Sequence, residues 1–352
     1  MAGNDQDRSD SRCLLLTFNL SVRSKTIVPF GLPGFSHKAE NASFIFNYVL
    51  SDVTVDSLVF EIIDDQGVVI YQQLPETHYT LAGAHQINWD GFDNDDIYDS
   101  SRFIGRVLKA KITALKAGVS ETLTVDFTAK YQVVKWVDVK IERGSKKITA
   151  TLRTNFNEGG NPELLALAIA GIKYHWGRNE QQLAGKNIVF GHGEVYQFFV
   201  NVNNTNNNAL KSPKIVYQTN ARSRRSRNWE LSRILFYNIG HLQHRGKWYY
   251  KSREKADADF KLIAAHEIGH EILLAYGGHL YSKTHKGSST LVTQQPLGNY
   301  IYPEYGEIDL MLYYFQDQLR TNPSDYISRS IASERDTLGL IWLSKLRIQG
   351  LY

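Results

Sequence analysis

The sequence predicts an α+β fold, in which an all-β N-terminal half precedes a unit of mixed strands and helices. Short β-branched and aromatic runs separated by turn residues fill positions 14–145, and helix-compatible apolar runs follow them. The length of 352 residues favours two cores rather than one. We therefore expect a flexible N-terminus (1–13), a β-sandwich module (14–145) and an α+β domain (146–352).

The residue pattern of the N-terminal half predicts a β-sandwich of short strands. A turn at 64–67 joins two of these strands as a hairpin. Strand-like runs lie at 14–20, 43–50, 57–63, 68–71, 84–89, 108–114 and 135–141.

An aspartate-dense segment, Asn88–Asp99, lies between two of these strands. Its Trp-Asp-Gly-x-Asp start resembles a turn of the small immunoglobulin-like modules in flagellar hook-capping and many bacterial surface proteins. That resemblance implies an immunoglobulin-like sandwich. The carboxylates of Asp90–Asp99 can bind calcium, but the spacing is not that of an EF-hand. Aspartates also close turns by bonding to their own backbone, and we favour this structural role.

Beyond residue 146 the sequence predicts alternating strands and helices. Asn161-Pro162 marks the start of one helix, with a capping side chain and proline at the first position. A second helix is expected at 229–237 and a third from about Glu254 to a stop at Gly277-Gly278. Strands are expected at 147–152, 196–202 and 214–217.

The third helix carries the motif His266-Glu267-Ile268-Gly269-His270. Residues four apart on a helix share one face, so both imidazoles can bind a single zinc ion. Glu267 has the position of a general base acting on water. Such a histidine pair also occurs as surface or satisfied core residues, but its place in an apolar helix favours a metal site.

A catalytic zinc requires a third protein ligand, which the sequence leaves open. The metzincin continuation is absent, because Leu273 and Tyr276 occupy its glycine and histidine positions. The segment 305–314 resembles the start of a further helix that carries acids. We expect Glu307 as the third ligand. The alternatives are Glu304, Asp309, His279 and His285.

Four segments together resemble the zincin-like metallopeptidase toxins of the bacterial type VI secretion system, especially the peptidase domain appended to VgrG-type spike proteins. They are the Trp-Asp-Gly turn, the Ala-His-Glu-Ile-Gly-His run, 284–289 and 306–311. The resemblance implies a zincin-like, gluzincin-type domain that holds Zn²⁺ through His266, His270 and Glu307, with Glu267 as base. It also implies an antibacterial effector that acts in the target-cell periplasm and pairs with an immunity protein.

Further site residues follow from the zincin comparison. In such peptidases a strand near the metal helix pairs with the extended substrate, so 196–202 or 214–217 is the expected edge. His285 either donates a hydrogen bond to the oxyanion or makes local loop contacts. The tyrosines that are further candidates for this donor are Tyr302, Tyr305, Tyr313 and Tyr314.

Composition limits the remaining possibilities. The net charge is +4, which does not by itself indicate nucleic-acid binding. The basic cluster 222–227 reads as a solvated loop, with an anionic patch as the alternative. Cys13 is the single cysteine, and no apolar run is long enough for a membrane span. The N-terminus does not resemble a signal peptide, so we expect synthesis in the bacterial cytoplasm and export without a cleaved signal. Type VI spike components are among the partners that the resemblance implies.

The sequence therefore predicts a zinc metallopeptidase that cleaves a protein or peptide substrate. Two alternatives remain open. One is a non-catalytic envelope- or partner-binding protein with a structural zinc site. The other is a zinc amidase that acts on cell-wall peptides.

Overall fold

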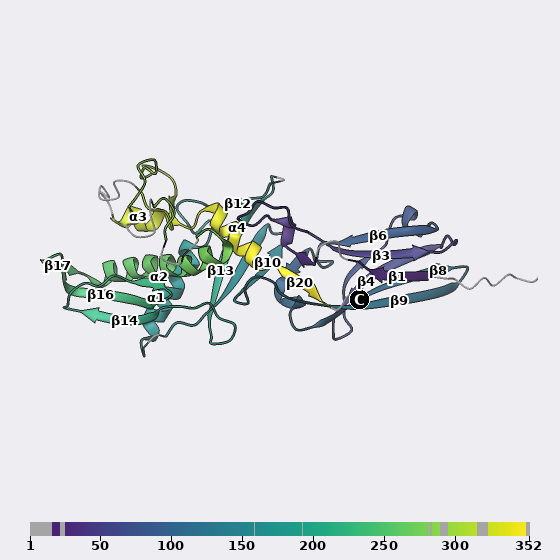
Figure 1. The fold of residues 1–352 in the computed structure, drawn as a ribbon, viewed down its shortest axis with the longest axis horizontal. Coiled ribbons are helices and arrows are strands. Elements are labelled where there is room, and N and C mark those ends of the chain that lie inside the picture. The colour runs from purple at the N-terminus through teal and green to yellow at the C-terminus, as the bar shows by residue number, and fades with distance from the viewer. Residues whose placement is uncertain are drawn as a thin grey trace, which may run out of the picture.

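The computed structural model describes residues 16–21, 25–157, 159–191, 193–279, 281, 284–288, 295–314 and 323–349. The expected N-terminal segment 1–13 and Cys13 lie outside these residues. The chain has a mixed α+β fold with several sheets, as predicted. Figure 1 shows an elongated molecule with strands at one end and most helices at the other.

Two antiparallel sheets face each other in the N-terminal half. One has the order β1 (Leu16–Leu20), β3 (Phe44–Leu50), β6 (Gly83–Trp89). The other has the order β2 (Thr26–Ile27), β20 (Leu346–Gln349), β9 (Val119–Tyr131), β8 (Val107–Lys116), β4 (Ser57–Ile63), β5 (Val69–Gln73). Phe44 lies 5.4 Å from Phe127 and Phe46 lies 5.0 Å from Phe60, between ring centroids, so aromatic side chains fill the space between the sheets.

A third sheet connects the two expected domains. Its order is β12 (Ile188–Val189), β13 (Val195–Asn204), β11 (Lys147–Thr154), β10 (Val137–Glu142), β7 (Ile97–Asp99). The expected boundary at 145/146 falls in the turn between the antiparallel partners β10 and β11. Strands from both sides of the boundary therefore share one hydrogen-bonded sheet.

The aspartate-dense segment forms the expected turn. Asp93 Oδ1 accepts hydrogen bonds from the backbone N–H groups of Asp95 (3.0 Å) and Ile97 (2.9 Å). Asp93 Oδ2 pairs with Arg102, and Asp90 pairs with Arg143. These carboxylates thus close the backbone turn and neutralise two arginines.

The rest of the chain surrounds two packed helices, α1 (Pro162–His175) and α2 (Arg253–Tyr276). A sheet with the order β14 (Lys214–Thr219), β16 (Ser232–His244), β15 (Arg227–Trp229) lies against α2, and β17 (Lys247–Lys251) pairs with β16. The remaining elements are β18 (Ile308–Asp309), α3 (Pro323–Arg329), β19 (Ser330–Ile331), α4 (Glu334–Leu343) and short 3-10 helices at Pro29–Gly31, Thr77–Thr80 and Ser100–Phe103.

Two helix predictions are wrong. Residues 229–237 comprise the end of β15, a two-residue turn and the first part of β16. Pairing of β16 with β14 and β15 satisfies their backbone groups and overrides local helix preference. Residues 305–314 contain β18, which pairs in parallel with β19. Within the described residues, no helix is both long and apolar enough to cross a membrane.

The contact between α1 and α2 depends on Gly171. A Cβ atom at this position would lie 2.1 Å from the carbonyl oxygen of Lys261 on α2. We expect Gly171→Ala to lower the free energy of unfolding by about 2 kcal/mol or more, because the helices must move apart. Gly144→Ala is the matched control, since no atom lies within 4 Å of its added Cβ. Chemical denaturation measures both, and equal stabilities would contradict the packing argument.

Candidate metal centre

Helix α2 holds the first two histidines rigidly. Its N-cap residue Ser252 accepts a hydrogen bond from Lys255 N–H, and Gly277 ends the helix with φ of 90°. The apolar face is buried, including Phe260, Ile268 and Ile272. The i, i+4 spacing brings His266 and His270 to ring centroids 5.0 Å apart.

His285 completes a cluster of three histidines. Its Nε2 lies 3.0 Å from Nε2 of His266, and its ring centroid lies 4.6 Å from that of His270. One nitrogen from each of the three residues lies within 4.8 Å of the others. Nitrogens bound to one tetrahedral zinc are separated by roughly 3.3 Å, so the cluster fits a metal ion with modest adjustment.

The surroundings of these rings favour neutral imidazoles. His266 Nδ1 donates a hydrogen bond to Leu310 O (2.8 Å), which leaves its Nε2 lone pair directed at the cluster. Burial lowers the pKa of His266, and burial together with the neighbouring histidines lowers that of His270. Neutral imidazoles are the form that binds metals, so the donor set suits a borderline cation such as zinc.

Glu267 lies beside the cluster in a dry environment. It is 6% exposed, and its Oε2 is 4.0 Å from His270 Nε2. Burial raises the pKa of Glu267 to about 8. Among the described residues, no hydrogen-bond partner reaches this Oε2. Such a carboxyl group can exchange a proton with a water molecule at the cluster.

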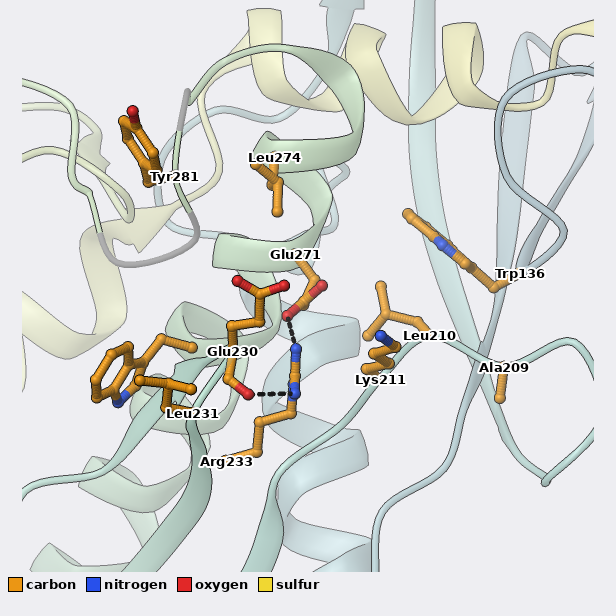
Figure 2. Close-up of a pocket in the computed structure, with 11 residues that line it drawn as sticks. Trp136, Ala209, Leu210, Lys211, Glu230, Leu231, Arg233, Glu271, Leu274 and Tyr281 are labelled. Atoms are coloured by element: carbon orange, nitrogen blue, oxygen red, sulfur yellow. Dashed lines mark hydrogen bonds and ion pairs between the residues drawn. The ribbon is translucent and has the colours of Figure 1, made fainter.

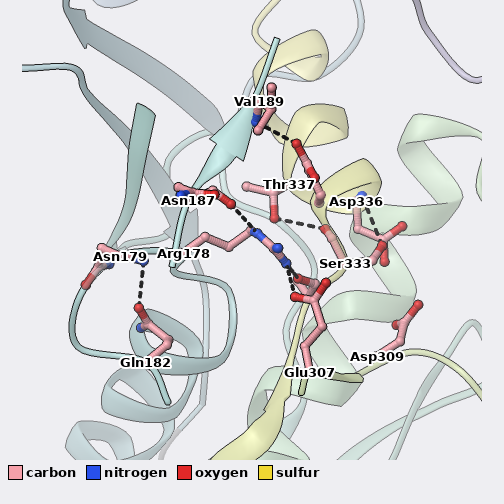
Figure 3. Close-up of polar contacts among 12 residues, drawn as sticks. Arg178, Asn179, Gln182, Asn187, Val189, Glu307, Asp309, Ser333, Asp336 and Thr337 are labelled. Carbon is pink, nitrogen blue, oxygen red and sulfur yellow. Dashed lines mark hydrogen bonds and ion pairs between the residues drawn. The ribbon is translucent and has the colours of Figure 1, made fainter. Parts of the chain in front are cut away.

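The expectation that Glu307 provides the third ligand is not met in this structure. The Glu307 carboxylate pairs with Arg178 Nη1 at 2.8 Å (Figure 3). Arg178 is itself only 4% exposed and donates to the carbonyls of Asn187 and Ala332. A buried guanidinium needs a charged partner, and Glu307 is that partner.

The other candidate ligands also lie outside the cluster. Asp309 pairs with Lys286, and Glu304 is exposed. His279 is buried, with its ring centroid 6.2 Å from that of His270. His285, which we considered as an oxyanion donor, instead belongs to the nitrogen cluster and stacks on Tyr313 at 3.8 Å.

A groove of about 330 Å³ opens above the cluster. Strand β15 forms one wall with Asn228 and Trp229, and Asn228 Nδ2 donates to the backbone oxygen of Glu267 (2.9 Å). Arg225 and Arg227, from the cluster expected in a solvated loop, also line this groove. Among the four tyrosine candidates, Tyr313 is the one that lines it.

Strand β15, which lines the groove, is neither of the two strands (196–202 and 214–217) expected to pair with a substrate. β13 belongs to another sheet, and β14 lies at the opposite side of the sheet that contains β15. Within the described residues, β15 pairs with β16 alone, so its other side is an edge. Three residues with two polar side chains carry too weak an alternation to be recognised as a strand from sequence.

A second cavity of about 620 Å³ adjoins the groove and shares Trp229 with it. Figure 2 shows Trp136, Leu210, Leu231, Leu274 and Tyr281 around its walls. Arg233 contacts both Glu271 (3.3 Å) and the Glu230 carbonyl within it. Leu231 is 82% exposed, so its apolar side chain is accessible from solvent.

Comparisons with known proteins do not assign a family. No protein-family model and no curated protein matches the chain. FlgD from P. aeruginosa is a solved structure with 14% identity and a TM-score of 0.21, covering 33% of this chain and 75% of its own. A β-glucuronidase from Parabacteroides merdae has 9% identity and a TM-score of 0.20, covering 75% of this chain and 33% of its own. Similarities this low carry no argument about function.

Proposed function

We propose that this protein is a zinc-dependent metallopeptidase whose metal ligands are His266, His270 and His285. The observation that carries the proposal is the convergence of three histidine nitrogens within 4.8 Å, beside buried Glu267 and below an open groove. When bound, zinc supplies Lewis acidity toward a carbonyl oxygen and toward water. Three protein ligands with groove access leave the open position that a catalytic site requires.

The residues of the chain supply the remaining chemistry. Glu267 accepts a proton from the attacking water at Oε2 and returns it to the departing amine, so the proton balance closes over one turnover. Strand β15 offers its unpaired backbone groups to an extended peptide. Asn228 holds β15 against α2 through its bond to the Glu267 carbonyl.

The resemblance of the sequence to type VI toxins supports a biological setting for this activity. We propose an antibacterial effector that acts in the periplasm of a target cell and is neutralised by an immunity protein. The facing antiparallel sheets of the N-terminal half support an immunoglobulin-like module there. Cleavage of peptide crosslinks in the cell wall is the alternative reaction, and peptidoglycan digestion beside a protein substrate distinguishes the two.

Metal content tests the ligand set directly. We expect about one zinc per wild-type chain, and loss of most of it in His266→Ala and in His285→Ala. Glu307→Ala is the informative control. The Glu307 carboxylate pairs with Arg178, so this substitution should leave the zinc content unchanged. Elemental analysis after dialysis measures all four proteins. Zinc loss in Glu307→Ala with retention in His285→Ala would refute this ligand set.

The role of Glu267 predicts a separation of binding from catalysis. Glu267→Ala should retain zinc and lose peptide hydrolysis by about 10²-fold or more, together with toxicity on periplasmic expression. Glu254→Gln, exposed in the first turn of the same helix, should behave as wild type. A fully active Glu267→Ala enzyme would exclude the mechanism. Inactivity of the zinc-loaded wild type on every peptide would favour the binding-protein alternative.

The cavity beside the groove predicts a substrate preference, because Trp136, Leu210, Leu231 and Leu274 contribute apolar side chains to its wall. Peptides with an aromatic or large aliphatic residue close to the cleaved bond should have kcat/KM at least about tenfold above peptides with glycine there. Leu231→Asp should reduce this ratio, because it replaces an apolar side chain of the cavity wall with a carboxylate. Leu183→Asp is the control, since Leu183 is 69% exposed and does not line the cavity. An unchanged ratio in Leu231→Asp would remove the cavity from substrate binding.

A further inference from the structure

Lys286 directly follows His285 in the sequence, and its ammonium group is largely enclosed by other residues. Its side chain is 23% exposed, and its Nζ donates to the carboxylates of Asp309 and Asp336 and to Ser333 Oγ (3.2 Å). Asp336 is 4% exposed at the start of α4, and Asp309 ends β18 (Figure 3). Lys286 thus joins two elements that are distant from each other in the sequence.

Backbone hydrogen bonds attach the same residue to the metal centre. Lys286 N–H donates to Met311 O (3.1 Å), and Tyr313 N–H donates to Lys286 O (2.9 Å). The segment 309–313 also provides the Leu310 carbonyl that orients His266 and the Tyr313 ring that stacks on His285. One short segment therefore positions two of the three histidines.

The charge arrangement makes this connection costly to break. A single ammonium group lies between two carboxylates, so its removal leaves two like charges in a region with little water. The carboxylates can separate only if β18 or the start of α4 moves. Either motion shifts the strand-like contact between 286 and 311–313, and with it His285.

We propose that Lys286 is a positioning residue whose ion pairs with Asp309 and Asp336 hold His285 in the metal-binding cluster. Helix α4, which contains no cluster residue, then controls the third nitrogen ligand through Asp336. This inference rests on the proposed zinc site and adds the device that completes it. Its consequence is that zinc affinity depends on a side chain that does not contact the metal.

The test measures zinc dissociation constants by chelator competition for the full-length protein. Lys286→Met should weaken zinc binding by about 10- to 100-fold, the range observed when groups supporting metal ligands are removed. The absorption spectrum of its cobalt(II) form should shift toward that of His285→Ala, because the third nitrogen is withdrawn. The double variant Lys286→Met/His285→Ala should bind no more weakly than His285→Ala alone, since Lys286 acts through His285.

A matched control separates positioning from general stability. Lys345 forms another enclosed pair, with Nζ 2.6 Å from Glu40 Oε1 and side-chain exposures of 13% and 15%. Lys345→Met should lower thermal stability and leave zinc affinity unchanged. If Lys286→Met does not fold, Asp336→Asn removes one carboxylate at nearly constant volume and should still weaken zinc binding at least severalfold.

The outcomes distinguish this proposal from the function on which it rests. Wild-type zinc affinity in Lys286→Met or in Asp336→Asn would overturn the positioning role and leave the metal centre intact. A double variant that loses affinity by the product of the two single losses would also overturn it. A wild-type protein that takes up no zinc would overturn the metal centre and this proposal together.

Discussion

The close packing of the segment 308–313 on helix α2 is the constraint on which the site depends. Gly269 lies between the two motif histidines, and a Cβ atom there would lie 2.3 Å from Met311 Sδ. Because Gly269 has no side chain, Met311 packs directly against the helix backbone. That contact brings the Leu310 carbonyl within reach of His266 and places Tyr313 beneath His285. A single glycine thus determines how the helix and the following segment meet.

Desolvation then sets the chemistry of the cluster. Burial lowers the pKa values of His266 and His270 and raises that of Glu267 to about 8. All three groups therefore favour their neutral forms at neutral pH. None of them carries a negative charge before a metal ion binds. A bound cation would reverse this preference for Glu267 by favouring its carboxylate. Neutral imidazole is the form that binds a metal ion, so the state of His266 and His270 supports the proposed site.

The C-terminal part of the chain connects the N-terminal sheets to the site. Strand β20 pairs with β9 in the N-terminal sheet, and α4 precedes it by a short connection. Asp336 at the start of α4 binds Lys286 next to the histidine cluster. Strand β20 and helix α4 thus link the N-terminal sheet to the histidine cluster. Strand β20 follows the expected 145/146 boundary in the sequence and pairs with a strand that precedes it.

The sequence by itself determined the α+β class, the helix that carries His266, Glu267 and His270, and its end at Gly277. These features are local, because helix periodicity, an N-cap serine and a C-terminal glycine act within a few residues. The tertiary structure decided the third member of the cluster. Glu307 and His285 are both plausible ligands in sequence, and the burial of Arg178 assigns Glu307 to an ion pair. It also decided that 229–237 forms strands, since the partner strand β14 comes from another part of the chain. Contacts between distant residues depend on how the elements pack, and local sequence patterns do not contain that information.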